Sequence, residues 1–233
     1  MIPIRDDAPR MATPFITYFI IALNVLVFFF ELALDDRSRT VLMFQFGLVP
    51  DHVLGLLRAE SVSVVPAVLP FLTSMFMHAN WLHIIANMWS LWIFGDNIEA
   101  YLGHFRYLLF YLLSGLGASL VHIFFNPNSE IPSVGASGAI AGVMGAYFLL
   151  YPTARVLTLI PFFFLYFTWL PAWLVLGYWI VVQFLSGAAT SISRPASGGG
   201  IAFWAHVGGF AAGAILIKLF PRRTPRYRFG GWG

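Results

Sequence analysis

The sequence contains no cysteine and few charged residues. Without cysteine there are no disulfides, no thiolate metal sites and no cysteine nucleophile, so serine is the natural candidate for any nucleophilic catalysis. Only 10% of the 233 residues are charged, whereas soluble domains carry about 25%. Together with a hydrophobic content of 59% and a mean hydropathy of +0.80, this excludes an ordinary soluble domain and indicates an integral membrane protein.

The basic residues favour lipid over nucleic acid as a partner. The pI of about 9.4 is in the range of nucleic-acid-binding domains, but the basic residues gather in residues 221–233, beside a hydrophobic segment. Anionic lipid headgroups are the usual partners of such a tail. We therefore expect the lipid bilayer as a partner, and no nucleic acid.

Six apolar segments predict an all-α integral membrane protein, a six-transmembrane-helix bundle. The segments cover residues 13–34, 75–94, 105–125, 135–151, 156–185 and 201–220. Because Pro161 and Pro171 interrupt the fifth segment, only its second half is expected to span the membrane. The fourth segment is short for a bilayer, so its first residues are expected to lie below the membrane surface.

The connections differ in character. Residues 35–73 mix charges with amphipathic pieces, which predicts a long first loop lying in the membrane interface. Residues 95–99 are polar and are predicted to end the second span. Residues 186–200 are rich in glycine, serine and alanine, and are predicted to form a flexible loop.

The charge distribution predicts the orientation. Residues 1–12 are expected to be a cytoplasmic N-terminus, residues 13–220 the six-span domain and residues 221–233 a basic cytoplasmic tail. With six spans, both termini share a side, and that side holds Arg5, Arg10, Arg106, Arg155, Arg222, Arg223, Arg226 and Arg228. The opposite side holds Arg37, Arg39, Arg58 and Arg194. The positive-inside rule then places both termini in the cytoplasm.

Ser137 begins the fourth apolar segment, within V-G-A-S-G-A. Free N–H groups and the positive end of the helix dipole favour negative charge there, which suits an oxyanion. Gly135 and Gly138 flank the serine and would allow close approach of a substrate. The alternative is that Ser137 is an N-cap, followed by a small-residue packing stripe that starts at Gly138.

His206 is a polar residue inside the sixth apolar segment. Ionisable groups at membrane depth are costly, so they indicate function first. Gly209 and Gly213 form a small-residue face that continues from the histidine, and two such helices can pack backbone to backbone. This packing would bring His206 to Ser137 as a Ser-His dyad. The alternative is a histidine that bonds a neighbouring helix.

His83 and Asn87 lie four residues apart in the second apolar segment, with His78 just before them. This spacing places His83 and Asn87 on one helical face, where both side chains could donate hydrogen bonds to a developing oxyanion. The alternative is that they connect neighbouring helices. Asn24, Glu31, His122 and Gln183 also lie in or near spans, but without partners at useful spacing they are interpreted as structural.

These motifs resemble the rhomboid family of intramembrane serine proteases, in its prokaryotic form. The resemblance rests on H-x4-H-x3-N from His78 to Asn87, G-A-S-G at residues 135–138 and A-H-x-G-G-x-x-x-G at residues 205–213. It extends to the six-span layout and the long first loop, where F-G-L-V-P occupies residues 46–50. The resemblance therefore covers most of the chain.

The resemblance implies a function and a role for each residue. Ser137 would be the nucleophile and His206 the general base and acid, while His83, Asn87 and the Ser137 backbone N–H would form the oxyanion hole. His78 would help to hold a water-accessible cavity. The substrate would be a transmembrane helix of another protein, cut after a small residue, with no metal or cofactor, in a bacterial inner membrane.

Two departures from the family pattern and two rival functions complete the prediction. Many members carry Trp-Arg before a threonine resembling Thr73, where this chain has Leu69 and Pro70, and the aromatic that often follows the serine by one turn is Ala141 here.

A non-catalytic rhomboid-like protein that binds membrane helices would have the same fold, although such proteins usually lose the serine or the histidine. A transporter that uses buried polar side chains as its path is the second rival.

Overall fold

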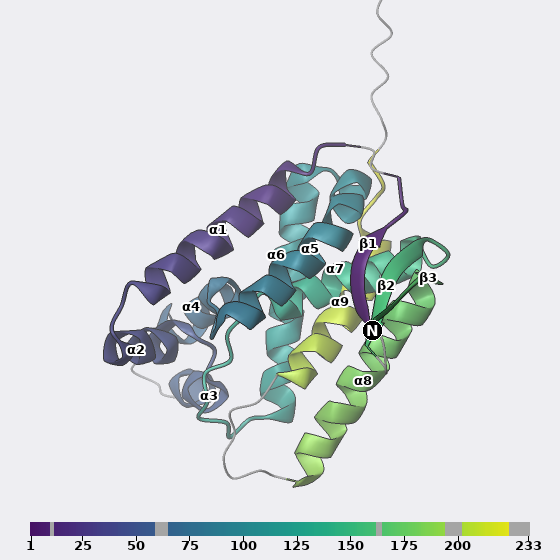
Figure 1. Cartoon of the computed structure of the whole chain (residues 1–233). Helices are drawn as coiled ribbons and strands as arrows, with labels where there is room; N and C mark the ends of the chain where they lie inside the picture. The colour runs from purple at the N-terminus through teal and green to yellow at the C-terminus, as the bar shows by residue number, and fades with distance from the viewer. Residues whose placement is uncertain (10–11, 59–64, 162–164, 194–201, 224–233) are drawn as a thin grey trace, which may run out of the picture.

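The computed structural model describes residues 1–9, 12–58, 65–161, 165–193 and 202–223. Figure 1 shows a bundle of helices with a small sheet at one side. The helices are α1 (Phe15–Leu32), α2 (Asp36–Phe46), α3 (Pro50–Arg58), α4 (Val65–Thr73), the 3-10 turn η1 (Ser74–Phe76), α5 (Trp81–Leu102), α6 (His104–Phe125), α7 (Ser137–Leu150), α8 (Ala172–Ser193) and α9 (Phe203–Leu219). The strands are β1 (Ile2–Asp6), β2 (Arg155–Pro161) and β3 (Leu165–Pro171).

The predicted helical membrane bundle is confirmed, and each of the six apolar segments contains a helix. Helices α1, α6 and α8 are long and apolar enough to cross a membrane, and the α4–η1 unit and α5 form a pair bent by 79°. Helices α7 and α9 are shorter, with 14 and 17 residues. At 1.5 Å per residue α7 extends only about 21 Å, less than the roughly 30 Å hydrocarbon layer. The count of six spans stays a prediction.

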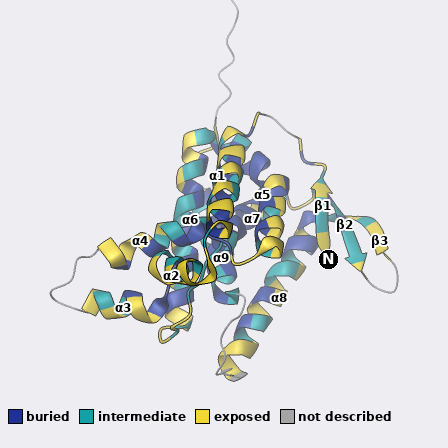
Figure 2. Ribbon diagram, turned by 60° about the vertical axis from the view of Figure 1, so that its left-hand side comes forward, coloured by how far each residue is buried: buried dark blue, intermediate teal, exposed yellow. Residues whose placement is uncertain are grey.

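Helix α7 lies at the centre of the bundle. Every residue from Gly138 to Tyr147 is buried, whereas α1 and α8 leave many apolar side chains exposed, as Figure 2 shows. An apolar residue that faces lipid needs no protein neighbour, so the exposed faces of the outer helices fit a membrane. Ser137, at the start of α7, is half-buried among the neighbouring elements.

The long first loop folds into α2, α3 and α4 at one end of the bundle (Figure 1). Leu48 pairs with Ser133 in an isolated antiparallel bridge. Thr73 Oγ1 donates a hydrogen bond of 2.6 Å to the Phe46 carbonyl, so a threonine anchors this loop without the Trp-Arg pair. These contacts join the first loop to the segment that leads into Ser137.

The three-stranded sheet was not predicted. Strand β1 pairs antiparallel with β2, and β2 with β3. Only the second half of residues 156–185 was expected to span the membrane, and the first half instead contributes the paired strands β2 and β3. Pro161 and Pro171 end β2 and β3, positions where a missing N–H costs little.

Asp6, the last residue of β1, fastens the sheet to the bundle, and Asp7 connects the end of β1 to β2. Tyr147 Oη donates to Asp6 Oδ2 at 2.6 Å, and Asn97 Nδ2 donates to the same oxygen at 3.2 Å. The Arg155 backbone N–H and guanidinium each donate to the Asp7 carboxylate at 2.7 Å, and these two bonds lower the pKa of Asp7 below its ordinary value. The predicted N-terminal tail is thus partly an ordered strand.

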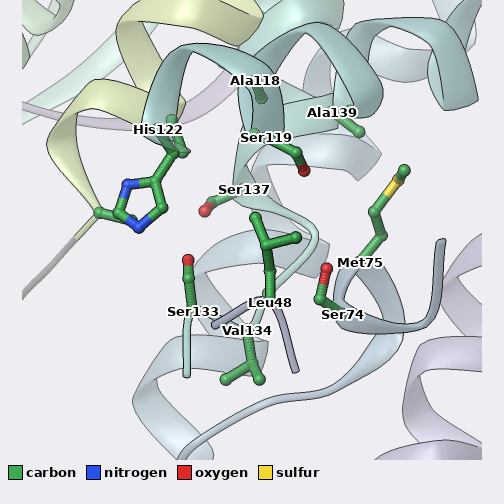
Figure 3. A pocket seen from close by; sticks show the side chains of 15 residues that line it. Leu48, Ser74, Met75, Ala118, Ser119, His122, Ser133, Val134, Ser137 and Ala139 are labelled. Carbon is green, nitrogen blue, oxygen red and sulfur yellow. The ribbon is translucent and has the colours of Figure 1, made fainter. Parts of the chain in front are cut away.

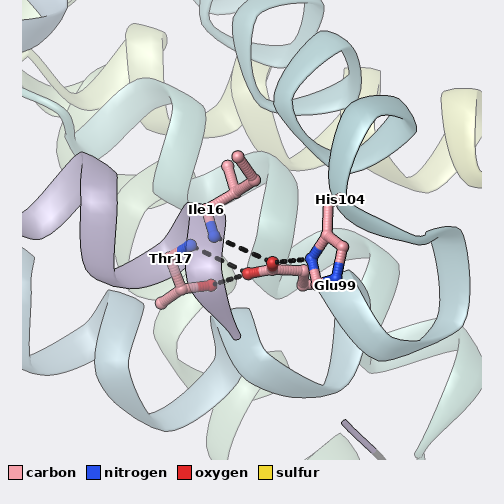
Figure 4. Close-up of polar contacts among 4 residues, drawn as sticks. All are labelled: Ile16, Thr17, Glu99 and His104. Atoms are coloured by element: carbon pink, nitrogen blue, oxygen red, sulfur yellow. Dashed lines mark hydrogen bonds and ion pairs between the residues drawn. The ribbon is translucent and has the colours of Figure 1, made fainter. Parts of the chain in front are cut away.

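Residues 95–99 were predicted to end the second span, and this boundary is wrong. They are buried within α5, which continues to Leu102. The reason is visible in Figure 4: Glu99 accepts hydrogen bonds from Ile16 N, Thr17 N and Thr17 Oγ1 at 2.8–2.9 Å, and its Oε1 lies 2.6 Å from His104 Nδ1. The Glu99 side chain thereby satisfies the free N–H groups that begin α1.

The predicted flexible loop at residues 186–200 is also partly wrong, since α8 continues to Ser193 and residues 194–200 lie outside the described part. Beyond α9, Arg223 N donates to the Tyr101 carbonyl at 2.8 Å. This contact places the end of α9 beside the α5–α6 connection, at the same end of the bundle as residues 12–14 (Figure 1). Arg226 and Arg228 of the predicted tail lie outside the described residues.

Candidate active site

Ser137 is the first residue of α7, and the structure contradicts its interpretation as an N-cap. The N-cap position is Ala136, with no side-chain capping bond. The Ser137 Oγ instead lies 2.8 Å from His206 Nε2 of α9. The two residues are 69 positions apart in the sequence, so the packing of α7 on α9 creates this contact.

Glycines allow that packing. A Cβ on Gly209 would collide with the Gly138 carbonyl, and a Cβ on Gly213 would collide with the Gly142 carbonyl. The backbones of α7 and α9 therefore touch along the two small-residue faces, as close-packed membrane helices do. This close approach brings the His206 ring within hydrogen-bond distance of Ser137.

His206 is buried and has polar partners on both ring nitrogens. Its Nδ1 lies 2.7 Å from Gln183 Oε1 of α8. An amide oxygen can only accept, so Nδ1 carries a proton, and Nε2 of the neutral ring is an acceptor for the Ser137 hydroxyl proton. The Trp179 ring lies beside the imidazole, with centroids 5.6 Å apart and planes inclined by 34°.

His83 and Asn87 face the turn that precedes Ser137. Gly135 has φ +129°, and a Cβ built on it would lie 2.6 Å from His83 Nε2 and 3.5 Å from Asn87 Nδ2. Only glycine tolerates both this backbone conformation and this proximity. Asn87 Nδ2 also lies 3.0 Å from His78 Nε2, so His78 contacts Asn87 directly.

Two charged residues support the segment before α5. The Glu31 carboxylate accepts from the His78 backbone N–H at 3.2 Å, and Arg39 Nη2 donates to the Ala79 carbonyl at 2.8 Å. Asn80 Oδ1 then caps α5 by accepting from His83 N at 2.9 Å. These bonds fix where α5 begins, and with it the position of His83.

A small cavity of about 30 Å³ opens beside Ser137. Figure 3 shows Ser133, Ser137 and His122 around it. Gly115, Ala118, Ala202 and Ala205 are among its small apolar lining residues. This volume is large enough to hold at least one water molecule.

Residues 66–223 match the family model of the rhomboid domain. The chain belongs to the rhomboid family. It is 31% identical to Rhomboid-like protein 11, chloroplastic, of Arabidopsis thaliana over 195 residues, which cover 78% of this chain and 64% of that protein. It is 33% identical to Rhomboid protease GluP of Bacillus subtilis (strain 168) over 138 residues, 59% of this chain and 24% of that protein. It is 34% identical to Rhomboid protein 1, mitochondrial, of Saccharomyces cerevisiae over 88 residues, 36% of this chain and 25% of that protein. The chain thus spans between about a quarter and two thirds of these relatives.

Sequence reasoning missed two contacts of His206 in this rhomboid protein. Gln183 was interpreted as structural for want of a partner, but it bonds His206. Trp179, four residues earlier in α8, provides the ring that Ala141 cannot. The available signal was the i, i+4 pairing of Trp179 and Gln183 on one helical face.

The other polar residues of the spans have local partners. Asn24 Nδ2 donates to the Ile20 carbonyl in its own helix at 2.8 Å, and the ring Nδ1 of His122 lies 3.4 Å from Asn126 Nδ2. Among the residues that the structure describes, no group of three or more histidine, cysteine, aspartate or glutamate residues could hold a metal ion.

Proposed function

We propose that this rhomboid protein is an intramembrane serine endopeptidase that cleaves transmembrane helices of other proteins through a Ser-His dyad. The observation that carries the proposal is the 2.8 Å contact between Ser137 Oγ and His206 Nε2. Nucleophile and base at this distance are the signature of an activated serine. The printed name of the Bacillus subtilis relative, a rhomboid protease, supports the same activity.

The proposed reaction is acyl transfer in two steps. Ser137 Oγ attacks the scissile carbonyl carbon while its proton moves to His206 Nε2. The C–N bond then breaks, and His206 gives this proton to the leaving nitrogen, which leaves an acyl-enzyme on Ser137. A water molecule repeats the sequence, with His206 as base, and releases the new carboxyl end.

The proposed oxyanion hole consists of His83, Asn87 and the Ser137 backbone N–H. Its support is the arrangement of His83 and Asn87 against Gly135, two residues before the nucleophile. The N–H groups at the start of α7 are free of intrahelical partners, so they add donors at the same place. In this proposal His78 orients the Asn87 amide, and Gly135, Gly138, Gly209 and Gly213 allow the close approach of the backbones.

The cavity beside Ser137 favours a substrate with a small residue before the cleaved bond. Its lining includes the small residues Gly115, Ala118, Ala202 and Ala205, which leave room for a small side chain beside Ser137. Water would reach Ser137 from the end of the bundle that carries α2 and α3, because α7 is short and the segment before it pairs with Leu48, between α2 and α3. The substrates in this proposal are transmembrane proteins in the same bilayer.

We also propose that both termini are cytoplasmic, in a bacterial inner membrane, with residues 13–220 as the membrane domain. The arginine distribution supports the orientation, and the likeness to the Bacillus subtilis protein supports the membrane. Two other relatives carry chloroplast and mitochondrial names. Reporter fusions after Gly103 and Arg155 test the orientation: both should report the cytoplasm, and an outside signal from either would contradict it.

The experiment that tests the activity is labelling of the detergent-solubilised protein with a fluorophosphonate probe, combined with turnover of a model transmembrane substrate. Ser137→Ala and His206→Ala should each abolish both signals. The double variant should lose no more than either single variant, because residues that act as one unit are strongly non-additive. The control variants are Ser90→Ala and His52→Ala, where Ser90 bonds only its own helix and His52 is exposed on α3.

The outcome separates the protease from its rivals. A non-catalytic membrane-helix binding protein or a transporter would show no labelling that depends on Ser137. Substantial proteolysis by purified Ser137→Ala protein would refute the assignment of the nucleophile. Losses that multiply in the double variant would refute the dyad.

A further inference from the structure

We propose that Gln183 is a positioning residue that fixes the tautomer and the orientation of His206, and so forms the third member of a Ser-His-Gln triad. The inference rests on the proposed function, since it assigns a role relative to the dyad. Its basis is the 2.7 Å contact between Gln183 Oε1 and His206 Nδ1.

The first argument concerns the proton. A neutral imidazole carries its proton on either nitrogen, and only the Nδ1–H form can accept the Ser137 proton at Nε2. Gln183 Oε1 accepts from Nδ1–H and thereby favours this form. A triad aspartate performs the same orientation in soluble serine proteases, but a neutral amide does so without bringing a charge to membrane depth, where charge is costly.

The second argument concerns the ring orientation. Gln183 and Trp179 lie four residues apart, so they share one face of α8. Gln183 holds the edge of the imidazole, and Trp179 lies beside the ring at 5.6 Å. With Ser137 at the other nitrogen, the ring is held at both nitrogens and beside the Trp179 ring. Since α8 supplies two of these contacts, His206 is aligned only while α8 packs against α9.

The third argument concerns the burial of Gln183. Its side chain is buried in an apolar helix that has no charged residue within its described length. A buried amide is costly unless it is hydrogen-bonded. The hydrogen-bond partner of Gln183 Oε1 is the His206 ring. We therefore assign this buried amide the specific role of orienting that ring. A purely structural amide would affect stability rather than the rate of the chemical step.

The test compares Gln183→Met, Gln183→Asn and Gln183→Glu with the control Gln45→Met, which makes the first change at an exposed position of α2. The measurements are the rate of fluorophosphonate labelling, kcat and KM for a model transmembrane substrate, and the thermal unfolding midpoint in detergent. Methionine preserves length without an acceptor, asparagine withdraws the acceptor by one methylene, and glutamate keeps an acceptor oxygen in place.

Gln183→Met should lower the labelling rate and kcat by about ten-fold or more, with KM changed less than about two-fold. Gln183→Asn should lose activity similarly, Gln183→Glu should recover most of it, and Gln45→Met should match the wild type. If Gln183→Met or Gln183→Asn folds and keeps wild-type labelling and kcat, the proposal is refuted. If Gln183→Met does not fold, the contrast between the asparagine and glutamate variants decides. Wild-type labelling that does not depend on Ser137 would refute the proposed function instead.

Discussion

Gly209→Ala should weaken both the bundle and the dyad. A Cβ at Gly209 would overlap the Gly138 carbonyl and lie 3.3 Å from the Ala118 Cβ. Neither obstacle is a flexible side chain, so α9 must move away from α7 by about 1 Å to reach an ordinary contact. That movement would stretch the 2.8 Å contact between Ser137 and His206 beyond hydrogen-bond distance.

The expected magnitude follows from two opposed effects. Overpacking costs about 1–3 kcal/mol, while alanine in place of glycine favours a helix by about 0.5–1 kcal/mol. The free energy of unfolding should therefore fall by up to about 2.5 kcal/mol, and the fluorophosphonate labelling rate should fall by about ten-fold or more.

Gly55→Ala is the matched control for this change. It makes the same substitution in helix α3, where an added Cβ meets nothing within 4 Å. This variant should be as stable as the wild type or slightly more stable. The assays are thermal unfolding in detergent and labelling kinetics of the same samples. A Gly209→Ala protein that matches Gly55→Ala in both assays would show that α7 and α9 are not in backbone contact, and the argument for the site geometry would fail.

Three further predictions concern separate parts of the structure. Asn87→Ala should lower kcat about ten-fold or more with little change in KM, since the proposed donor acts on the transition state; a rise in KM alone would make Asn87 an interhelical contact. Glu99→Gln should lower the free energy of unfolding by about 1–3 kcal/mol, because it weakens the hydrogen bonds that hold the start of α1. The control Glu130→Gln, on the surface, should change the free energy of unfolding little. Equal stabilities of the two variants would contradict this role of Glu99. The hydrogen bonds from Arg155 lower the pKa of Asp7 below its ordinary value of 3.8. The ionised Asp7 therefore stabilises the docking of β1 above about pH 4, and this stabilisation is lost as the pH falls through the lower pKa of the folded state. The protection factors for hydrogen exchange of residues 2–6, which are corrected for the intrinsic pH dependence of exchange, should fall over that pH range in the wild type. They should be insensitive to pH in Asp7→Asn, and identical profiles would refute the role of this ion pair.

The helices could be predicted from the sequence because long apolar runs and small-residue stripes are local patterns. The sheet could not, since β1 pairs with residues about 150 positions away, and an apolar strand such as β2 has the same composition as a membrane helix. Residues 95–99 were interpreted as a loop because the partners of Glu99 in α1 are more than 80 positions away.

The same reasoning applies to the candidate site. Ser137 and His206 could be singled out because polar groups in apolar helices are rare, and the structure places them in contact. The i, i+4 spacing of Trp179 and Gln183 indicates a shared face of α8, but it does not identify His206 as their partner, because His206 lies on the next helix. The catalytic roles of Ser137 and His206, and the oxyanion roles of His83 and Asn87, stay predictions.

The pairing of β1 with β2 has a consequence for how the protein is made. Residues 2–6 leave the ribosome before every other described element, but their partners in β2 follow only after α1, α5, α6 and α7 have been synthesised. During that time β1 has an unpaired edge, and contacts between such distant segments form slowly. Docking of the strand therefore belongs to the last events of folding, together with the arrival of α8. A chain arrested before residue 155 would contain Ser137 and α7, but it would have neither the complete sheet nor His206, the partner of Ser137.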